Sequence, residues 1–395
     1  MKKQKSKSLV IRNGKILLPN GRIILSDLSI ENGKIASIGP GHEARNQSAL
    51  INAAGKYVLP GFIDLHTHGI GYESYTSSLK AYAAKEGGRG TTTFYPTLFG
   101  SIDFICTHLR RNLAETRNLE EVPQVGGFRL ESPYLAKTGA GREQDLAKIT
   151  QANTSRLLEA GGGRIKIWDV SPELKNACET IRFLTRQGIL CSMAHTNATI
   201  EQARAAVKAG ARLVTHLFDT FAPPPVTDPG VYPVSLTDYF LLEDGVACEI
   251  IADGTHVHPL LVQLALRCKP EDKVAFVTDS NYGAGLPPGV YLLPTSCRKA
   301  TIRGPNDGVR LVSRLRGLSG SALTPLDAFR NAIRMFGQGI PAASRLCSRN
   351  PARIMGLKKG EIRKGFDADF VILTPALDIT HTIVGGNVIY KKSAR

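Results

Sequence analysis

Two histidines stand one residue apart at the end of an apolar run. The stretch PGFIDLHTHG covers residues 60–69 and contains His66 and His68. Side chains at positions i and i+2 of a β-strand point to the same face, so these imidazoles are expected to lie side by side. Such a pair either fills a polar hole in a core or holds a ligand such as a metal ion.

Other histidines and carboxylates follow apolar runs at equivalent positions along the chain. They are Glu131, His195, His216, Asp253, His256 and Asp279. A lone histidine at a strand end is more often hydrogen-bonded in place than a ligand. Burying several imidazoles and carboxylates together, however, costs several kcal/mol per unpaired group unless they bind a metal or one another. The set as a whole therefore indicates a site with chemistry.

Eight strand-like runs, separated by helical stretches, carry these residues. The runs cover 57–66, 91–98, 126–133, 164–170, 188–195, 211–218, 247–254 and 273–280. The stretch after the fifth run opens with Thr199 as a helix cap and closes on Gly210. Eight strand and helix units over about 250 residues predict an α/β fold of the (β/α)8 TIM-barrel class. In that fold the carboxyl ends of the strands meet at one face, where chemistry takes place.

Both chain ends have a different texture, in which short β-like runs alternate with turns. Asn-Gly and Gly-Pro pairs interrupt residues 8–58, and residues 360–392 return to the same pattern. Such punctuation predicts short hairpins. We therefore expect a small β-sandwich built from residues 1–58 and 349–395, and a barrel domain over residues 59–348.

The composition is that of an ordinary globular protein. The 395 residues are 42% hydrophobic and 7% aromatic, and no apolar run approaches the length of a membrane span. The seven cysteines are an odd number without a CxxC pair, which favours a reducing compartment and argues against a thiolate zinc site. We expect a cytoplasmic protein with no membrane partner.

The net charge of +16 raises the question of nucleic-acid binding. Part of the excess lies in the terminal runs KKQKSK and KKSAR, and no zinc-finger, RNP-type aromatic or recognition-helix pattern lies between them. We therefore expect a solvated basic surface and no nucleic-acid partner. A role of this charge in attracting anionic substrates stays open.

Several motifs resemble a known enzyme superfamily. PGFIDLHTHG, VTDS and the C-terminal NPARIMGLKKGEIRKGFDADFVIL are similar to the metal-dependent amidohydrolases. Within that superfamily, LESP, AHTNAT, THLFDTF, IADGTHV and GLSGSALT resemble the N-acetylglucosamine-6-phosphate deacetylase family, in order and across nearly the whole chain. The resemblance also implies a homodimer.

Carried over position by position, the resemblance implies a metal centre and a general base. The implied ligands of one or two divalent metals are His66, His68, Glu131, His195 and His216. Glu131 would bridge the two positions where both are filled. Nitrogen and oxygen ligands fit zinc first, with iron or manganese as alternatives. Asp279 would be the general acid and base, and its other interpretation is a further ligand or a strand-end cap.

The resemblance places the substrate contacts in loops that follow the strands. They are Ala140, Asp219, Thr220, His256, Leu318, Ser319 and Gly320. The chain departs from the family here, because Asp219 and Thr220 replace an Asn-Ala pair. Thr227 or Asp228 also stands where the family has an arginine that pairs with phosphate. An added carboxylate and a lost guanidinium both oppose phosphate binding.

Three other positions invite alternative interpretations. Many amidohydrolases bridge their metals with a carbamylated lysine, for which Lys166 is a candidate. It lies three residues before the polar end of its strand, and Glu131 can fill the bridging role, so we expect Lys166 to be structural. Glu173 is expected to orient its neighbours. Arg142 is either a substitute cation for the substrate or an exposed loop arginine.

The expected function is metal-dependent hydrolysis of the acetamide of an N-acetylated amino sugar. The first candidate substrate is N-acetylglucosamine 6-phosphate, which would give glucosamine 6-phosphate and acetate. A non-phosphorylated or differently acylated amino sugar is the next candidate. Another amidohydrolase reaction, such as N-acyl-amino-acid or cyclic-amide hydrolysis, and an inactive scaffold are the remaining alternatives.

Overall fold

The chain forms two compact units, each made of separate stretches of sequence. The computed structural model describes all residues except 1–7, 41–48, 225, 295–297, 313–316 and 394–395. One unit comprises residues 1–64, 83–93 and 325–395, and the other comprises 65–82 and 94–324. The domain borders expected after residues 58 and 348 stay a prediction, because the limits of these units cut across single strands.

Eight parallel strands form a barrel sheet. They are β6 (Phe62–Thr67), β7 (Thr91–Leu98), β8 (Phe128–Leu130), β9 (Ile165–Val170), β10 (Leu190–Met193), β11 (Leu213–Val214), β12 (Ala247–Ile251) and β13 (Val274–Val277). Each strand neighbours the next in chain order, and a bridge between Thr67 and Ser280 joins the first strand to the last. The strands are almost entirely buried, as is usual for parallel sheets. The predicted TIM-barrel class is confirmed.

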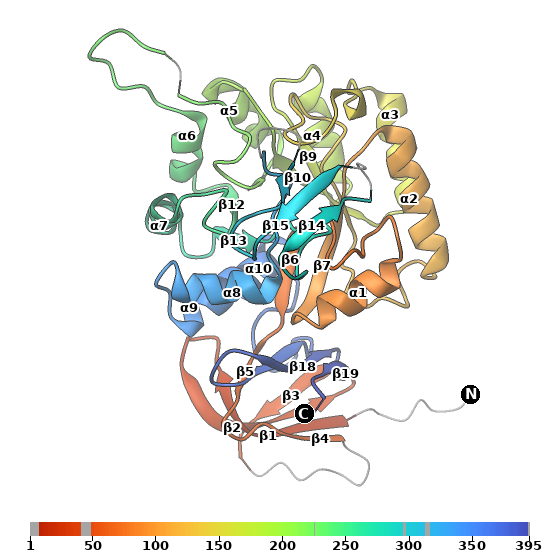
Figure 1. Ribbon diagram of the computed structural model, residues 1–395, viewed down its shortest axis with the longest axis vertical. Coiled ribbons are helices and arrows are strands. Elements are labelled where there is room, and N and C mark those ends of the chain that lie inside the picture. The colour runs from red at the N-terminus through yellow and green to blue at the C-terminus, as the bar shows by residue number, and fades with distance from the viewer. Residues whose placement is uncertain (1–7, 41–48, 225, 295–297, 313–316, 394–395) are drawn as a thin grey trace. The chain divides into compact units, whose positions relative to one another are not determined.

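Helices α1 to α7 separate these strands along the chain, and α8 to α10 follow the last of them. They are α1 (Leu79–Gly87), α2 (Ile102–Glu115), α3 (Gln151–Gly161), α4 (Ala177–Arg186), α5 (Ile200–Ala209), α6 (Leu236–Leu242), α7 (Pro259–Cys268), α8 (Pro325–Arg334), α9 (Ile340–Ser344) and α10 (Asn350–Ile354). Helices α2 to α7 lie around the outside of the strands (Figure 1). Helix α5 has the expected cap, in which the Thr199 side chain accepts a hydrogen bond from the backbone of Gln202. Among the described helices, none is long and apolar enough to cross a membrane.

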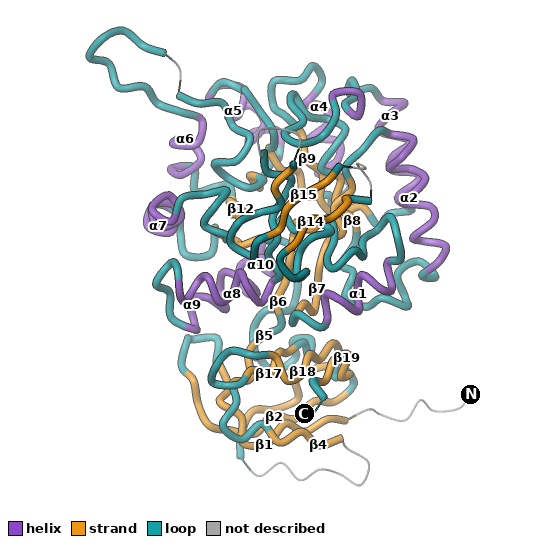
Figure 2. Tube along the Cα trace, in the orientation of Figure 1, coloured by secondary structure: helices purple, strands orange, loops and turns teal. Residues whose placement is uncertain are grey.

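Strands from both chain ends share a second sheet (Figure 2). They are β1 (Ser8–Leu17), β2 (Ile23–Glu31), β3 (Lys34–Ile38), β4 (Ala49–Asn52), β5 (Tyr57–Pro60), β17 (Phe370–Leu373), β18 (Ile379–Val384) and β19 (Asn387–Lys391). Strand β5 pairs with β1 on one side and with β17 on the other, so the expected pairing of the two ends is confirmed. The pair Asn13-Gly14, expected at a turn, instead lies at a register shift within β1.

The continuous strand expected over residues 57–66 is in fact two strands in two sheets. The first part is β5 and the second is β6, with Gly61 between them. A Cβ atom at Gly61 would lie 2.1 Å from Cγ2 of Thr92, so only glycine permits this close approach. The break was not predicted, because the residues on both sides of it are apolar and read as one strand.

A small three-stranded sheet between β13 and α8 was not expected from the sequence. It consists of β14 (Gly289–Leu292), β15 (Lys299–Ile302) and β16 (Arg310–Leu311). Leu293 and Ile302 belong to its own apolar core, together with Tyr282 from the loop that follows β13. This sheet carries residues that reach the site described below.

Candidate active site

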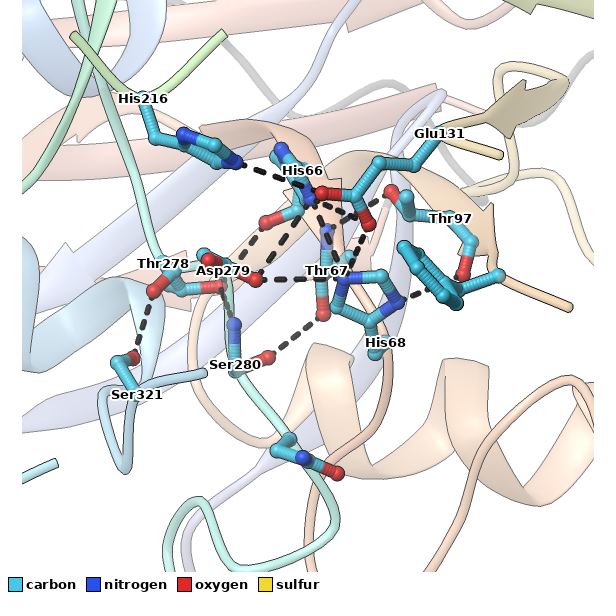
Figure 3. A network of polar contacts seen from close by, with 12 residues as sticks. His66, Thr67, His68, Thr97, Glu131, His216, Thr278, Asp279, Ser280 and Ser321 are labelled. Carbon is cyan, nitrogen blue, oxygen red and sulfur yellow. Dashed lines mark hydrogen bonds and ion pairs between the residues drawn. The ribbon is translucent and has the colours of Figure 1, made fainter. Parts of the chain in front are cut away.

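Polar residues predicted at strand ends come together at the carboxyl end of the barrel, and Figure 3 shows five of them, His66, His68, Glu131, His216 and Asp279. His66 lies near the end of β6. The others follow their strands within two residues: His68 follows β6, Glu131 follows β8, His195 follows β10, His216 follows β11 and Asp279 follows β13. Three of these have positive φ angles, of 45° at His195, 28° at His216 and 46° at Asp279. Such backbone strain costs about 1–3 kcal/mol per residue and clusters at functional sites.

Glu131 lies between two pairs of imidazoles. Its Oε1 atom is 2.9 Å from Nε2 of His195 and 3.4 Å from Nε2 of His216. Its Oε2 atom is 3.2 Å from Nε2 of His68 and 3.6 Å from Nε2 of His66. One carboxylate therefore faces two histidine pairs with two different oxygens, which is the geometry required of a bridging ligand.

The donor set fits a divalent metal. The Nε2 atoms of His66 and His68 are 3.2 Å apart, and Nδ1 of His68 lies 2.9 Å from the carbonyl oxygen of Thr97. A proton on that Nδ1 makes a hydrogen bond to the carbonyl and leaves the Nε2 lone pair facing the cluster. Ligand atoms of His66, His68 and Glu131 lie within 4.8 Å of one another, as do those of Glu131, His195 and His216. Imidazole and carboxylate ligands at this spacing suit zinc, iron or manganese.

Protons compete with a metal for these ligands. Burial lowers the pKa of His68, but its hydrogen bonds to Asp279 and Glu131 outweigh burial and raise the pKa to about 10. The pKa of His216 is raised to about 10, because Glu131 again outweighs burial. Raised pKa values mean that a metal must displace protons from these imidazoles, so metal affinity is expected to fall as the pH falls.

Asp279 lies beside the histidine pair at the end of β6. Its Oδ1 atom is 3.3 Å from Nε2 of His68 and 3.6 Å from Nε2 of His66. Burial raises the pKa of Asp279, but the charges of His66 and His68 outweigh burial and hold the pKa below its usual value. The carboxylate is therefore ionised at neutral pH and can accept a proton. A Cβ atom at Gly320 would lie 2.7 Å from the carbonyl oxygen of Asp279, so glycine permits this loop to pass close.

A cavity of about 500 Å³ opens onto the metal-ligand cluster. The predicted substrate-contacting residues all line it, namely Ala140, Asp219, Thr220, His256, Leu318, Ser319 and Gly320. His66 is fully buried and does not line it, whereas His68 does. Gly139 brings the loop after β8 against the site, because a Cβ atom there would lie 3.1 Å from Cε1 of His195. The predicted metal and substrate residues therefore form one continuous site.

His256 is held in a fixed orientation by Asp253. Oδ2 of Asp253 accepts a hydrogen bond of 2.6 Å from Nδ1 of His256, and Oδ1 accepts one from the backbone N–H of the same residue. Burial lowers the pKa of His256, but Asp253 outweighs burial and raises it above its ordinary value. A protonated His256 can donate a hydrogen bond to a substrate oxygen.

Several residues that line the cavity were not predicted from the sequence. They are Tyr75, Phe99, Phe104, Asp145, Leu293 and Arg298. Arg298, directly before β15, donates a hydrogen bond of 3.3 Å to the carbonyl oxygen of Ala140. Arg142 makes two hydrogen bonds to Asp145, of 3.1 and 3.0 Å, so its charge is already paired. The sequence around Arg298 contains no pattern that would predict its contact with a loop far away in the chain.

Glu173 and Lys166 have the contacts expected of residues that orient their neighbours or support the structure. Glu173 accepts hydrogen bonds of 2.5 Å from Oγ1 of Thr196 and 2.6 Å from the backbone N–H of Asn197, which holds the loop directly after His195. Lys166 donates to the carbonyl oxygen of Gly163 at 3.1 Å and does not line the cavity. This position of the Lys166 amine does not suit a metal bridge.

Comparison with known proteins gives consistent similarities over nearly the whole chain. The model of the amidohydrolase family matches residues 57–389. An N-acetylglucosamine-6-phosphate deacetylase of Lysinibacillus sphaericus is 30% identical over 390 residues, covering 96% of this chain and 97% of the relative. An N-acetylgalactosamine-6-phosphate deacetylase of Escherichia coli O157:H7 is 28% identical and covers 96% and 98%. The crystal structure of N-acetylglucosamine-6-phosphate deacetylase from Pasteurella multocida has a TM-score of 0.85 at 25% identity, covering 98% and 100%.

Proposed function

Because this chain belongs to the amidohydrolase family and is a hydrolase of amide bonds, we propose that it deacetylates an N-acetylated amino sugar 6-phosphate. N-acetylglucosamine 6-phosphate is the first candidate, and its galactosamine counterpart is the second. The observation that carries the proposal is Glu131, which lies between two histidine pairs beside an ionisable carboxylate and a cavity. Other amidohydrolase reactions are not favoured, because the relatives described above, at 28–30% identity over nearly their whole length, are deacetylases of amino sugar 6-phosphates.

The chain's own residues divide the work of hydrolysis. A divalent metal, zinc as first candidate, would polarise the amide carbonyl and lower the pKa of a water molecule when bound by the five ligands. Asp279 accepts a proton from the attacking water and gives it to the amide nitrogen as the carbon–nitrogen bond breaks. His256 donates a hydrogen bond to an oxygen of the substrate. The second proton of the water passes from the new carboxylic acid to the amine, so the products are acetate and the protonated amine, and atoms and charge balance.

Acetate release from a panel of sugars tests the proposal. The panel contains N-acetylglucosamine 6-phosphate, N-acetylgalactosamine 6-phosphate and the two sugars without phosphate, each assayed with metal-loaded protein. We expect the highest kcat/KM for one of the phosphorylated sugars. Equal or better turnover of an unphosphorylated sugar would contradict phosphate recognition, and no acetate from any of the four would contradict deacetylation.

Arg298 is the residue that we expect to pair with the substrate phosphate. It lines the cavity and donates a hydrogen bond to the carbonyl oxygen of Ala140, one of the residues expected to contact the substrate. A charge-assisted hydrogen bond contributes about 1.5–3 kcal/mol. Replacing Arg298 by methionine should therefore raise KM for the phosphorylated sugar about 10- to 100-fold. Steady-state kinetics on sugars with and without phosphate measures this.

The matched control is Arg142→Met, which removes the same charge from the same cavity. We expect a smaller rise of KM for this variant, since its guanidinium is held by Asp145. The unphosphorylated sugar should be hydrolysed by wild type and Arg298→Met at similar rates. An equal effect of Arg298→Met on both kinds of sugar would rule out phosphate pairing.

We further propose a homodimer, supported by a projecting loop with exposed apolar side chains. Residues 226–234 extend away from the barrel between β11 and α6 (Figure 1). Val226 is 101% exposed and Tyr232 is 95% exposed, and Val231 and Val234 are exposed as well. Apolar side chains that protrude into water in this way favour association with a partner surface.

Replacing Tyr232 by aspartate should therefore weaken the dimer. We expect the wild type to sediment as a dimer in analytical ultracentrifugation and the variant to shift toward the monomer at micromolar concentration. Phe183→Asp makes a comparable apolar-to-acidic change at another exposed position, on α4, and should leave the dimer intact. A monomeric wild type, or equal behaviour of the two variants, would contradict a dimer formed through this loop.

A reducing compartment, the cytoplasm first, is the location that we propose. In the described part of the chain, the cysteines form no disulfide with one another; they are Cys106, Cys178, Cys191, Cys248, Cys268 and Cys347. Burial raises the pKa of several of these thiols, Cys191 to about 12 among them, which disfavours the reactive thiolate. Buried inert thiols support a protein that keeps its cysteines reduced.

A further inference from the structure

A second charged cluster lies inside the barrel, next to the candidate metal centre. Arg129 on β8 is fully buried, two residues before Glu131. Asp169 on β9 and Glu249 on β12 are fully buried as well. Neither the proposed reaction nor the cavity uses these three residues. Buried ionic clusters seldom increase stability over an apolar core, so their presence calls for another explanation.

The guanidinium of Arg129 has a partner for each of its five N–H groups. Asp169 accepts two hydrogen bonds, from Nε at 3.1 Å and from Nη2 at 3.0 Å. Glu249 accepts one from Nη1 at 2.6 Å, and Oγ1 of Thr215 accepts one from Nη2 at 2.8 Å. The carbonyl oxygen of Leu65 accepts the fifth, from Nη1 at 3.0 Å. Leu65 and Thr215 directly precede His66 and His216, so one side chain fixes the backbone beside two candidate ligands.

The two carboxylates of this cluster are used differently. Both oxygens of Asp169 accept hydrogen bonds from Arg129. Only Oε1 of Glu249 does so, and its Oε2 atom makes no hydrogen bond with any residue in the described part of the chain. This second oxygen faces Nδ1 of His66 at a distance of 3.7 Å. Two carboxylates exceed the charge of one guanidinium, and the carboxylate oxygen that Arg129 does not bind is the one that faces His66.

We propose that Arg129 and Glu249 are positioning residues for His66. Arg129 fixes Glu249 so that its second carboxylate oxygen faces Nδ1, which favours a proton on Nδ1 and leaves the Nε2 lone pair for a metal. The same Nε2 atom faces His68 and Asp279, at 3.2 and 3.6 Å from the nearest atom of each. The inference rests on the proposed function for the statement that His66 and His68 form the second metal position.

The Nδ1 atoms of the other candidate histidines have different hydrogen-bond surroundings. Nδ1 of His68 contacts a backbone carbonyl oxygen. Nδ1 of His195 and Nδ1 of His216 have no hydrogen-bond partner within the described residues. Within this cluster it is therefore the free-facing oxygen of Glu249 that acts on His66 alone, at the position that His66 shares with His68.

The test is stepwise metal binding by the variant Glu249→Gln. Metal-free full-length protein is titrated with zinc in a metal buffer, and bound zinc is measured by elemental analysis after dialysis. We expect wild type to bind two zinc ions per chain. In the variant, the affinity for one of the two zinc ions should fall about 10- to 100-fold, which is the usual effect of removing a residue that supports a metal-bound histidine. The affinity for the other zinc ion should be unchanged.

Asp169→Asn is the matched control, since it removes one carboxylate charge from the same guanidinium without touching His66. It should bind both zinc ions like wild type. If Glu249→Gln does not fold, Glu249→Asp keeps the charge, withdraws the carboxylate by one methylene group and should show an intermediate loss. Thermal unfolding of the metal-free variants separates effects on folding from effects on metal affinity.

Two results would overturn the inference. One is wild-type affinity for both zinc ions in Glu249→Gln, and the other is an equal loss in Asp169→Asn. A wild type that binds a single zinc ion would overturn the two-metal centre and this inference together. Two bound zinc ions without amino sugar deacetylation would contradict only the proposed function.

Discussion

Replacement of Asp279 by asparagine is expected to lower kcat about 10²- to 10⁴-fold while the protein keeps its metal. Asparagine has nearly the same shape but cannot accept the proton of the attacking water or return it to the amine. The metal is retained because Glu131, His195 and His216 do not depend on this carboxylate for their mutual contacts. The measurement is acetate release at saturating substrate, together with metal content by elemental analysis.

Asp219→Asn is a suitable control, because Asp219 is another carboxylate at the same cavity. Its replacement is expected to change KM and to leave kcat within about tenfold of the wild-type value. A kcat of Asp279→Asn close to that of wild type would exclude the role of Asp279 as general base. Loss of metal from Asp279→Asn would instead favour the interpretation of Asp279 as a ligand.

The site was predictable because polar residues at the ends of buried strands are costly unless they have a function. His66, Glu131, His195 and Asp279 each follow an apolar run, and parallel strands bring such ends to one face of a barrel. Periodicity and polarity alone were enough to group these residues. Their exact partners were not predictable, because the distances between strands depend on packing across the whole barrel.

The substrate pocket was only partly predictable. Leu318, Ser319 and Gly320 were identified through a motif, and the structure places them at the cavity. Arg298 and Leu293 were missed, because they reach the cavity from a small sheet whose position depends on its own apolar core. Loops bring residues together by tertiary packing, and short-range sequence patterns contain little information about that packing.

The charged cluster around Arg129 left a signal that was overlooked. Arg129, Asp169 and Glu249 each lie in a mainly apolar strand, in FRL, IKIWDV and ACEII. A charged residue inside a buried strand needs a partner of opposite charge, and here one positive and two negative side chains occur on three strands of one barrel. The pairing could therefore have been predicted, whereas the contact of Glu249 with His66 could not.

Replacement of His195 by glutamine is expected to remove metal from the position that His195 shares with His216 and Glu131. Glutamine has a similar reach, but its neutral amide is a much poorer metal ligand than imidazole. We expect a fall of more than about 100-fold in affinity, since loss of a direct ligand exceeds the 10- to 100-fold effect of a supporting partner. Deacetylation should fall with the metal content and recover in part when zinc is added in excess.

His256→Gln separates metal loss from other effects at the same cavity. His256 lines the cavity, and its Nδ1 atom is hydrogen-bonded to Asp253, which is not one of the candidate metal ligands. This variant is expected to retain its metal and to lose kcat/KM without recovery on addition of zinc. The two variants therefore differ in metal content and in rescue, which distinguishes a ligand from a residue that contacts the substrate. Full metal content in His195→Gln would show that His195 is not a ligand, and the centre would then depend on Glu131 and the remaining histidines.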